Sequence, residues 1–143
     1  MAQGEFALGA IQFRQDVAVN PNDTEEAIWA YLCEAREVGT EAARAQFLSV
    51  GRDPRPVMRA AEAAFRLGDG VDGILAAAGP DSQGHDAFYS RFYAGLYHEA
   101  EGEEDAARGY LLQAVGTEYG ARSGDFMASL AKVHCLRRGW SSA

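Results

Sequence analysis

The chain has 143 residues, 48% of them hydrophobic, and a formal net charge of −8. A chain of this length is expected to form one domain that buries roughly 68–70% of its unfolded surface, which excludes disorder as a description of the whole. The acidic charge argues against nucleic acid and anionic membranes as partners, because both attract clustered cations. No apolar run reaches the length of about 18 residues that indicates a membrane span, so we expect a soluble, intracellular protein with no transmembrane segment.

The first predicted helix covers residues 5–19. Its apolar side chains form one stripe at helical spacing, made up of Phe6, Ala10, Phe13 and Val17. If the protein begins here, the helix has no preceding partner helix, and the stripe must pack elsewhere or contact another molecule. We therefore expect a homodimer or a larger complex to form through helix 5–19.

Four further helices are predicted before a polar loop at 79–86, and they are separated by Gly and Pro residues. They cover 24–38, 41–50, 56–67 and 71–78. Asp23 and Glu26 resemble a capping box at the start of helix 24–38, and Gly39 ends that helix. Pro56 suits the first turn of a helix, where its missing N–H is not needed.

Three more helices are predicted after the loop, at 87–101, 104–116 and 124–138. Ser123 or Asp125 begins the last of them, and Gly139 ends it. Segments with strand periodicity are no longer than a few residues. The sequence therefore predicts an all-α protein of about eight helices, arranged in antiparallel pairs with short connections.

Two of the predicted helix pairs look like copies of one repeat. Residues 27–35 align with residues 92–100: both segments end in Glu-Ala, and Ala30 coincides with Gly95. Small side chains at such positions let two helix axes approach closely. The alternative is an irregular α-domain in which the matches arise by chance, since Ala, Glu and Arg are common in this chain.

The clearer copy runs Gly95-x6-Gly102-x4-Ala107-x3-Leu111-x2-Ala114. This spacing resembles the tetratricopeptide-repeat (TPR) consensus. The resemblance implies an all-α, TPR-like helical-hairpin solenoid, an α–α superhelix, as a single domain over 1–143. In proteins of this kind the repeats normally continue upstream, so the chain is either one such domain or the C-terminal part of a longer array.

Three segments carry a narrower resemblance: FRQDVAVNPNDTEEAIWAYLCEA, VGRDPRPVMR and SGDFMASLAKVHCLRRGW. They are similar to TPR-like proteins of plant and algal plastids and to related bacterial proteins. The hairpin from Phe92 also resembles bacterial NlpI-type lipoprotein adaptors. These resemblances imply a scaffold role, supply no catalytic residues, and imply a chloroplast location if the chain comes from a plant or an alga.

The sequence shows no catalytic, cofactor-binding or metal-binding set. His98-Glu99 lacks the second histidine of a zinc-binding HExxH helix. His134 and Cys135 are adjacent on a helix and point about 100° apart, which does not suit a nucleophile and its base. Cys33 and Cys135 are too few for a disulfide scaffold and indicate buried thiols. We therefore expect no enzyme activity and no cofactor, and an enzyme or ligand-binding helical domain stays open as an alternative.

The TPR resemblance also implies where a partner binds, because the first helix of each hairpin lines the concave face. The corresponding side chains are Ala27, Tyr31 and Glu34 in one copy and Phe92, Leu96 and Glu99 in the other. Tyr89 is added as a candidate because its helix carries more large side chains than one buried stripe needs. We expect a non-enzymatic scaffold or assembly factor that binds a basic or amphipathic protein segment on this concave surface. One alternative is a permanently bound structural or accessory subunit of a larger complex, photosynthetic or membrane-associated. Another is that the aromatic residues pack between the hairpins.

Overall fold

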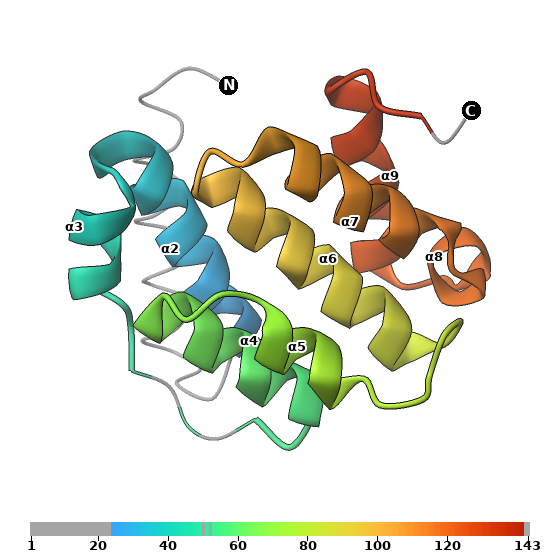
Figure 1. Ribbon diagram of the computed structural model, residues 1–143, viewed down its shortest axis with the longest axis horizontal. Coiled ribbons are helices and arrows are strands. Elements are labelled where there is room, and N and C mark those ends of the chain that lie inside the picture. The colour runs from blue at the N-terminus through green and yellow to red at the C-terminus, as the bar shows by residue number, and fades with distance from the viewer. Residues whose placement is uncertain (1–23, 50, 52, 142–143) are drawn as a thin grey trace. The chain divides into compact units, whose positions relative to one another are not determined.

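A computed structural model describes residues 24–49, 51 and 53–141, and every regular element in this part of the chain is an α-helix (Figure 1). The prediction of an all-α protein is confirmed for these residues. The predicted helix 5–19, and the association expected through it, lie outside them. The described helices are α2 (Thr24–Val38), α3 (Thr40–Ala45), α4 (Pro56–Leu67), α5 (Asp72–Ala77), α6 (His85–Ala100), α7 (Glu104–Gly116), α8 (Glu118–Arg122) and α9 (Phe126–Arg137).

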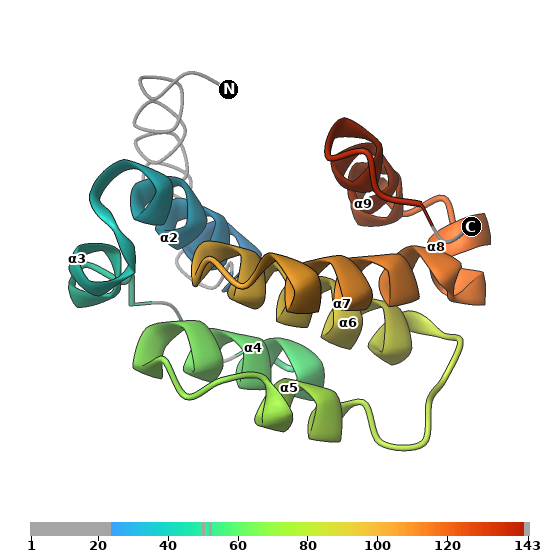
Figure 2. The same ribbon diagram turned by 45° about the horizontal axis from the view of Figure 1, so that its top comes forward.

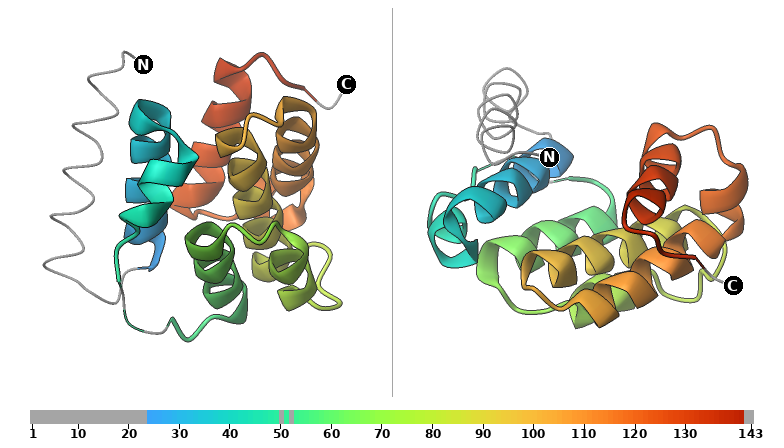
Figure 3. Two further views of the ribbon diagram at one scale, coloured as in Figure 1. Left: turned by 60° about the vertical axis from the view of Figure 1, so that its left-hand side comes forward. Right: turned by 90° about the horizontal axis from the view of Figure 1, so that it is seen from above.

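The chain divides into two compact units between Gly70 and Val71. In unit 1, helices α2, α3 and α4 contact one another, and α2 and α3 lie side by side (Figure 3). Ile28 and Phe65 are fully buried there. As predicted, Pro56 lies in the first turn of α4. The helix ends at Gly68, whose φ of 74° favours glycine.

Helix α3 is shorter than the sequence predicts. The expected range was 41–50, but the helix ends at Ala45. The backbone N–H of Gln46 bonds to the carbonyl of Ala43, which tightens the last turn. Phe47 then packs its ring against Tyr31, with centroids 5.8 Å apart. After Ala45 the chain therefore leaves the helix, and Phe47 contacts Tyr31 in the interior of unit 1.

Unit 2 is built around the hairpin of α6 and α7, which lie side by side (Figure 2). Gly102, with φ 79°, makes the turn between them. A Cβ atom on Gly95 would lie 2.6 Å from Cγ of Leu111 and 3.2 Å from the carbonyl oxygen of Ala107. The predicted close contact between these two helices is therefore confirmed, and only glycine fits it without adjustment.

A short helix, α8, joins the end of α7 to α9 and was not predicted. Thr117 is its N-cap: the hydroxyl accepts a hydrogen bond from the backbone N–H of Gly120 and donates one to the carbonyl of Ala114. Asp125 is the N-cap of α9 and Gly139 follows its end with φ 71°, as the sequence predicts. The hairpins α2–α3 and α6–α7 fall at the two predicted repeat copies. The solenoid arrangement and the single domain stay predictions.

None of the helices within residues 24–141 combines the length and apolar character needed to cross a bilayer.

Candidate functional site

Two of the predicted partner-binding residues, Tyr31 and Glu34, lie on α2 and are buried. Arg44 on α3 donates a hydrogen bond from Nη2 to the Tyr31 hydroxyl at 3.0 Å. The Tyr31 ring meets Phe65 of α4 edge-on, with centroids 5.6 Å apart. Tyr31 therefore joins the three helices that the structure describes in unit 1, which is the role of a core aromatic residue with a polar end.

The other four predicted residues lie on α6. Tyr89, Phe92 and Leu96 are buried, and the Phe92 ring stacks on Phe88 at a centroid distance of 5.5 Å. Glu99 is partly exposed, but its carboxylate binds side chains of this chain. The arrangement favours the alternative in which these aromatic residues pack in the interior, and the partner-binding role of the six residues stays a prediction.

A carboxylate with two tyrosine donors lies at the start of α9. Asp125 Oδ2 accepts hydrogen bonds from the hydroxyls of Tyr89 on α6, at 2.7 Å, and Tyr119 on α8, at 2.6 Å. Its Oδ1 accepts one from the backbone N–H of Met127. Burial disfavours the charged carboxylate, but these hydrogen bonds outweigh burial and lower the pKa of Asp125. We name Asp125, Tyr89 and Tyr119 the tyrosine–carboxylate cluster.

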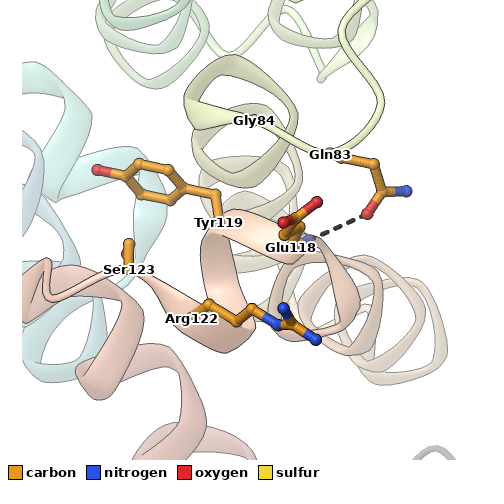
Figure 4. A pocket seen from close by; sticks show the side chains of 6 residues that line it. All are labelled: Gln83, Gly84, Glu118, Tyr119, Arg122 and Ser123. Carbon is orange, nitrogen blue, oxygen red and sulfur yellow. Dashed lines mark hydrogen bonds between the residues drawn. The ribbon is translucent and has the colours of Figure 1, made fainter.

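A shallow surface pocket of about 390 Å³ includes Tyr119 of this cluster in its lining, and Figure 4 shows the side chains around it. Its lining comes from the loop before α6 and from α8: Gln83, Gly84, Glu118, Tyr119, Arg122 and Ser123. Oε1 of Gln83 accepts a hydrogen bond from the backbone N–H of Glu118 at 3.0 Å, which joins the two sides. The lining holds one carboxylate, of Glu118, and one guanidinium group, of Arg122. The pocket therefore favours neither an anionic nor a cationic ligand.

A second carboxylate, Glu99 near the end of α6, binds the last turn of α9. Arg138 forms a two-pronged ion pair with it through Nε and Nη2, and the Nη2–Oε1 distance is 2.8 Å. Nε2 of His134 lies 3.1 Å from the same carboxylate, and the Trp140 ring lies 6.0 Å from the Arg138 guanidinium. Burial opposes the charge on Glu99, but the hydrogen bonds and positive charge of these partners prevail and lower its pKa. We name Glu99, His134 and Arg138 the Glu99 anchor.

The two clusters fix α9 at both of its ends. The tyrosine–carboxylate cluster ties its first turn to α6 and α8, and the Glu99 anchor ties its last turn to α6. Between them α9 contacts α7 and α8, and its buried side chains are small: Ala128, Ala131 and Cys135. Side chains this small let α9 lie close to its neighbours in unit 2.

The outer face of α9 carries large apolar side chains that are exposed. Phe126 is 74% exposed, Val133 43% and Leu136 75%. A helical rotation of about 100° per residue places all three on one side of the helix. We name Phe126, Val133 and Leu136 the α9 stripe.

The two cysteines are not activated nucleophiles. Burial raises the pKa of the Cys33 thiol, and the nearby charge of Glu34 raises it further. Burial also raises the pKa of the Cys135 thiol. Both thiols therefore stay protonated near neutral pH, where only the thiolate reacts. Among the residues that the structure describes, no group of three or more His, Cys, Asp or Glu side chains is placed to hold a metal ion.

Comparison of the chain with protein-family models, with curated proteins and with solved structures gave no match. The TPR and plastid resemblances therefore stay predictions from the sequence pattern. The α9 stripe was not predicted from the sequence. The signal was present, because apolar residues occur all around 126–137, and a helix of that kind has more than one face to bury.

Proposed function

We propose that this chain is a non-enzymatic protein-interaction module, and that it contacts its partner through the α9 stripe. The observation that carries the proposal is the exposure of Phe126, Val133 and Leu136 on one face of one helix. Single exposed apolar residues are common on protein surfaces, but several on one face are characteristic of a contact surface. The proposal keeps the scaffold role predicted from the sequence and moves its contact surface to α9.

Rigid presentation of α9 supports this role. Its first turn is held by Tyr89 and Tyr119 through Asp125, and its last turn by Glu99. A helix held at both ends loses little conformational freedom when a partner docks, so more of the contact energy remains as affinity. The small side chains on its inner face leave the large ones facing outward.

The size of the stripe favours a reversible contact over permanent incorporation into a complex. Permanent subunits bury apolar surfaces of roughly 2,000 Å² or more. Beyond the stripe, the large apolar side chains that are exposed among the described residues are Val38 and Leu67, which lie on α2 and α4. A three-residue stripe is a small part of such an interface, so it suits an adaptor that binds and releases its partner.

Site-specific photo-crosslinking in the native host tests the proposal. A benzophenone amino acid replaces Phe126, and the matched control places it at Leu67, an apolar residue of comparable exposure in unit 1. We expect a crosslinked product with another protein from position 126, weaker or absent from position 67, and lost when Leu136→Ser is added. The proposal is wrong if position 126 gives no more crosslinked protein than position 67.

A further inference from the structure

We infer that the segment which docks on the α9 stripe is an amphipathic helix whose apolar face is bordered by acidic residues. This inference rests on the proposed function, and it specifies the chemistry of the partner. It follows from the charges beside the stripe, from the length of the stripe, and from the gap within it.

Two cations border the stripe, one on each side. Lys132 and Arg137 are both exposed. At about 100° per residue, Lys132 lies beyond Leu136 on one side of the stripe, and Arg137 lies beyond Phe126 on the other. No Asp or Glu occurs from 126 to 137, although the chain as a whole carries a net charge of −8. The outer face of α9 is therefore a basic, apolar strip on an acidic protein.

The other basic groups at the end of α9 are already bound. Arg138 and His134 both contact the carboxylate of Glu99, so they do not contribute to the outer face. Nζ of Lys132 donates to the backbone carbonyl of Ala121 at 3.0 Å, which holds the side chain at the edge of the stripe. An ammonium group has three donors, so it can still donate to a carboxylate of a partner.

The dimensions of the stripe fit a helix. Phe126 and Leu136 are ten residues apart, which corresponds to about 15 Å, or nearly three turns, along α9. The exposed Ser129 lies between Phe126 and Val133 on the same face and leaves room for a large side chain of the partner. An amphipathic helix supplies apolar residues at this repeat and places carboxylates on both borders, as flanking charges do in paired helices.

Two other occupants fit the surface less well. A second copy docked stripe to stripe would bring Lys132 and Arg137 of both chains to one interface, where like charges repel. Attraction to an anionic lipid surface contributes about 1 kcal/mol for each cation near it. Two cations in the stripe contribute little against the repulsion of a chain whose net charge is −8. Carboxylates that flank an apolar face satisfy both cations and the apolar residues at once.

Selection from a displayed peptide library tests the inference. The peptides are helices with a constant leucine stripe, and their flanking positions are randomised among Glu, Gln and Lys. We expect the full chain to enrich Glu over Lys at the flanks by roughly tenfold, which corresponds to two exposed charge pairs. Lys132→Glu with Arg137→Glu should reverse the preference toward Lys. Phe126→Ser with Leu136→Ser should abolish enrichment of any kind, and circular dichroism checks that each variant keeps its helix content.

The outcomes separate this inference from the proposed function. Capture of peptides with neutral or basic flanks through the α9 stripe overturns the acidic partner and leaves the interaction module intact. No capture at all overturns the inference, and the absence of crosslinks from position 126 would remove the proposed function as well. A dimer in sedimentation that Leu136→Glu dissociates would make a second copy the occupant. Stripe-dependent binding to phosphatidylcholine–phosphatidylserine vesicles would make it a lipid surface, and either result overturns the inference.

Discussion

Asp125 receives hydrogen bonds from three donors on three different segments. The Tyr89 and Tyr119 hydroxyls reach Oδ2, while the backbone N–H of Met127 reaches Oδ1. Hydrogen bonds to a charged acceptor are short and roughly twice as strong as neutral ones. An N-cap normally serves its own helix. Here the same carboxylate also fixes two other helices, so its contribution extends beyond α9.

Removal of a tyrosine hydroxyl tests this connection. Tyr89→Phe and Tyr119→Phe should each lower the free energy of unfolding by about 1.5–3 kcal/mol, because each leaves the ring in place and deletes one hydrogen bond to a charged carboxylate. The double variant should lose more than the sum of the two single losses, since each single variant leaves Oδ2 one tyrosine donor and the double variant leaves it none. Urea unfolding followed by circular dichroism measures the change. Tyr110→Phe on α7 is the control, and losses no larger than that of the control would contradict the role of the cluster.

The sequence predicted the capping role of Asp125 but not its hydrogen bonds to Tyr89 and Tyr119. Asp125 was one of two predicted helix starts, beside Ser123, because either residue before an apolar helix is an N-cap signal. Its partner Tyr89 is 36 residues away in the chain, and no local pattern connects the two. The same holds for Arg138, which is 39 residues from Glu99. Caps are local and could be predicted, whereas these contacts depend on how α6 and α9 come together.

The contact between α6 and α7 depends on the absence of a side chain at Gly95. A Cβ there would lie 2.6 Å from Cγ of Leu111, well inside normal contact. Leu111 is itself fully buried, so it has no open space into which to move. Gly109 on α7 provides a natural comparison, because a Cβ at that position would meet nothing within 4 Å.

Paired alanine substitutions should therefore have opposite effects. Gly95→Ala is expected to destabilise the chain by about 1–3 kcal/mol, since the overpacking outweighs the better helix propensity of alanine. Gly109→Ala is expected to stabilise it by up to about 1 kcal/mol, because only the propensity changes. Thermal and urea unfolding measure both. Equal effects of the two substitutions would show that Gly95 is not a contact residue.

The long helices and the short α5, expected at 71–78, were predictable, whereas α8 and the end of α3 were not. Breaks at Gly39, Pro56 and Gly68 mark helix ends in the sequence, and the structure places ends there. Helix α8 has five residues, too few to show a hydrophobic period. The length of α3 was overestimated because Val50 was taken to continue its apolar pattern, while Phe47 instead leaves the helix to reach Tyr31.

Charge is distributed unevenly over the molecule. The chain carries 21 acidic and 13 basic side chains, yet 126–137 has no acidic residue, and its two outward cations border the α9 stripe. An acidic surface keeps like-charged copies apart and deters polyanions. A local basic strip on such a surface suits the acidic partner that we propose. The sequence predicted a basic guest from Glu34 and Glu99, but Glu34 is buried and Glu99 already binds Arg138.

The anchored carboxylates make the stability of the chain depend on acid pH. The folded pKa of Glu99 lies below its ordinary value, so the unfolded chain binds more protons in the interval between the two values. The stabilising contribution is therefore complete above about pH 5, near the unfolded pKa, and is lost as the pH falls through the folded pKa. The same sign applies to Asp125.

Glu99→Gln should lower stability by about 1–2 kcal/mol at neutral pH, because Arg138 and His134 lose a charged acceptor. Its midpoint temperature should also fall less than that of the natural chain between about pH 6 and pH 3, since one of the carboxylates that links folding to protons is gone. Glu104→Gln, at an exposed position in the first turn of α7, is the control. An unchanged dependence on acid would contradict the assignment to Glu99.

The division between Gly70 and Val71 has a practical spectroscopic consequence. The chain contains two tryptophans, and the division assigns Trp29 to one unit and Trp140 to the other. Trp140 is largely buried beside the guanidinium of Arg138, so its emission responds to the environment at the end of α9. A variant that keeps only Trp29 or only Trp140 has fluorescence that reports on one unit alone. Intrinsic fluorescence can thus distinguish cooperative melting of the whole chain from sequential melting of its halves, with no added label.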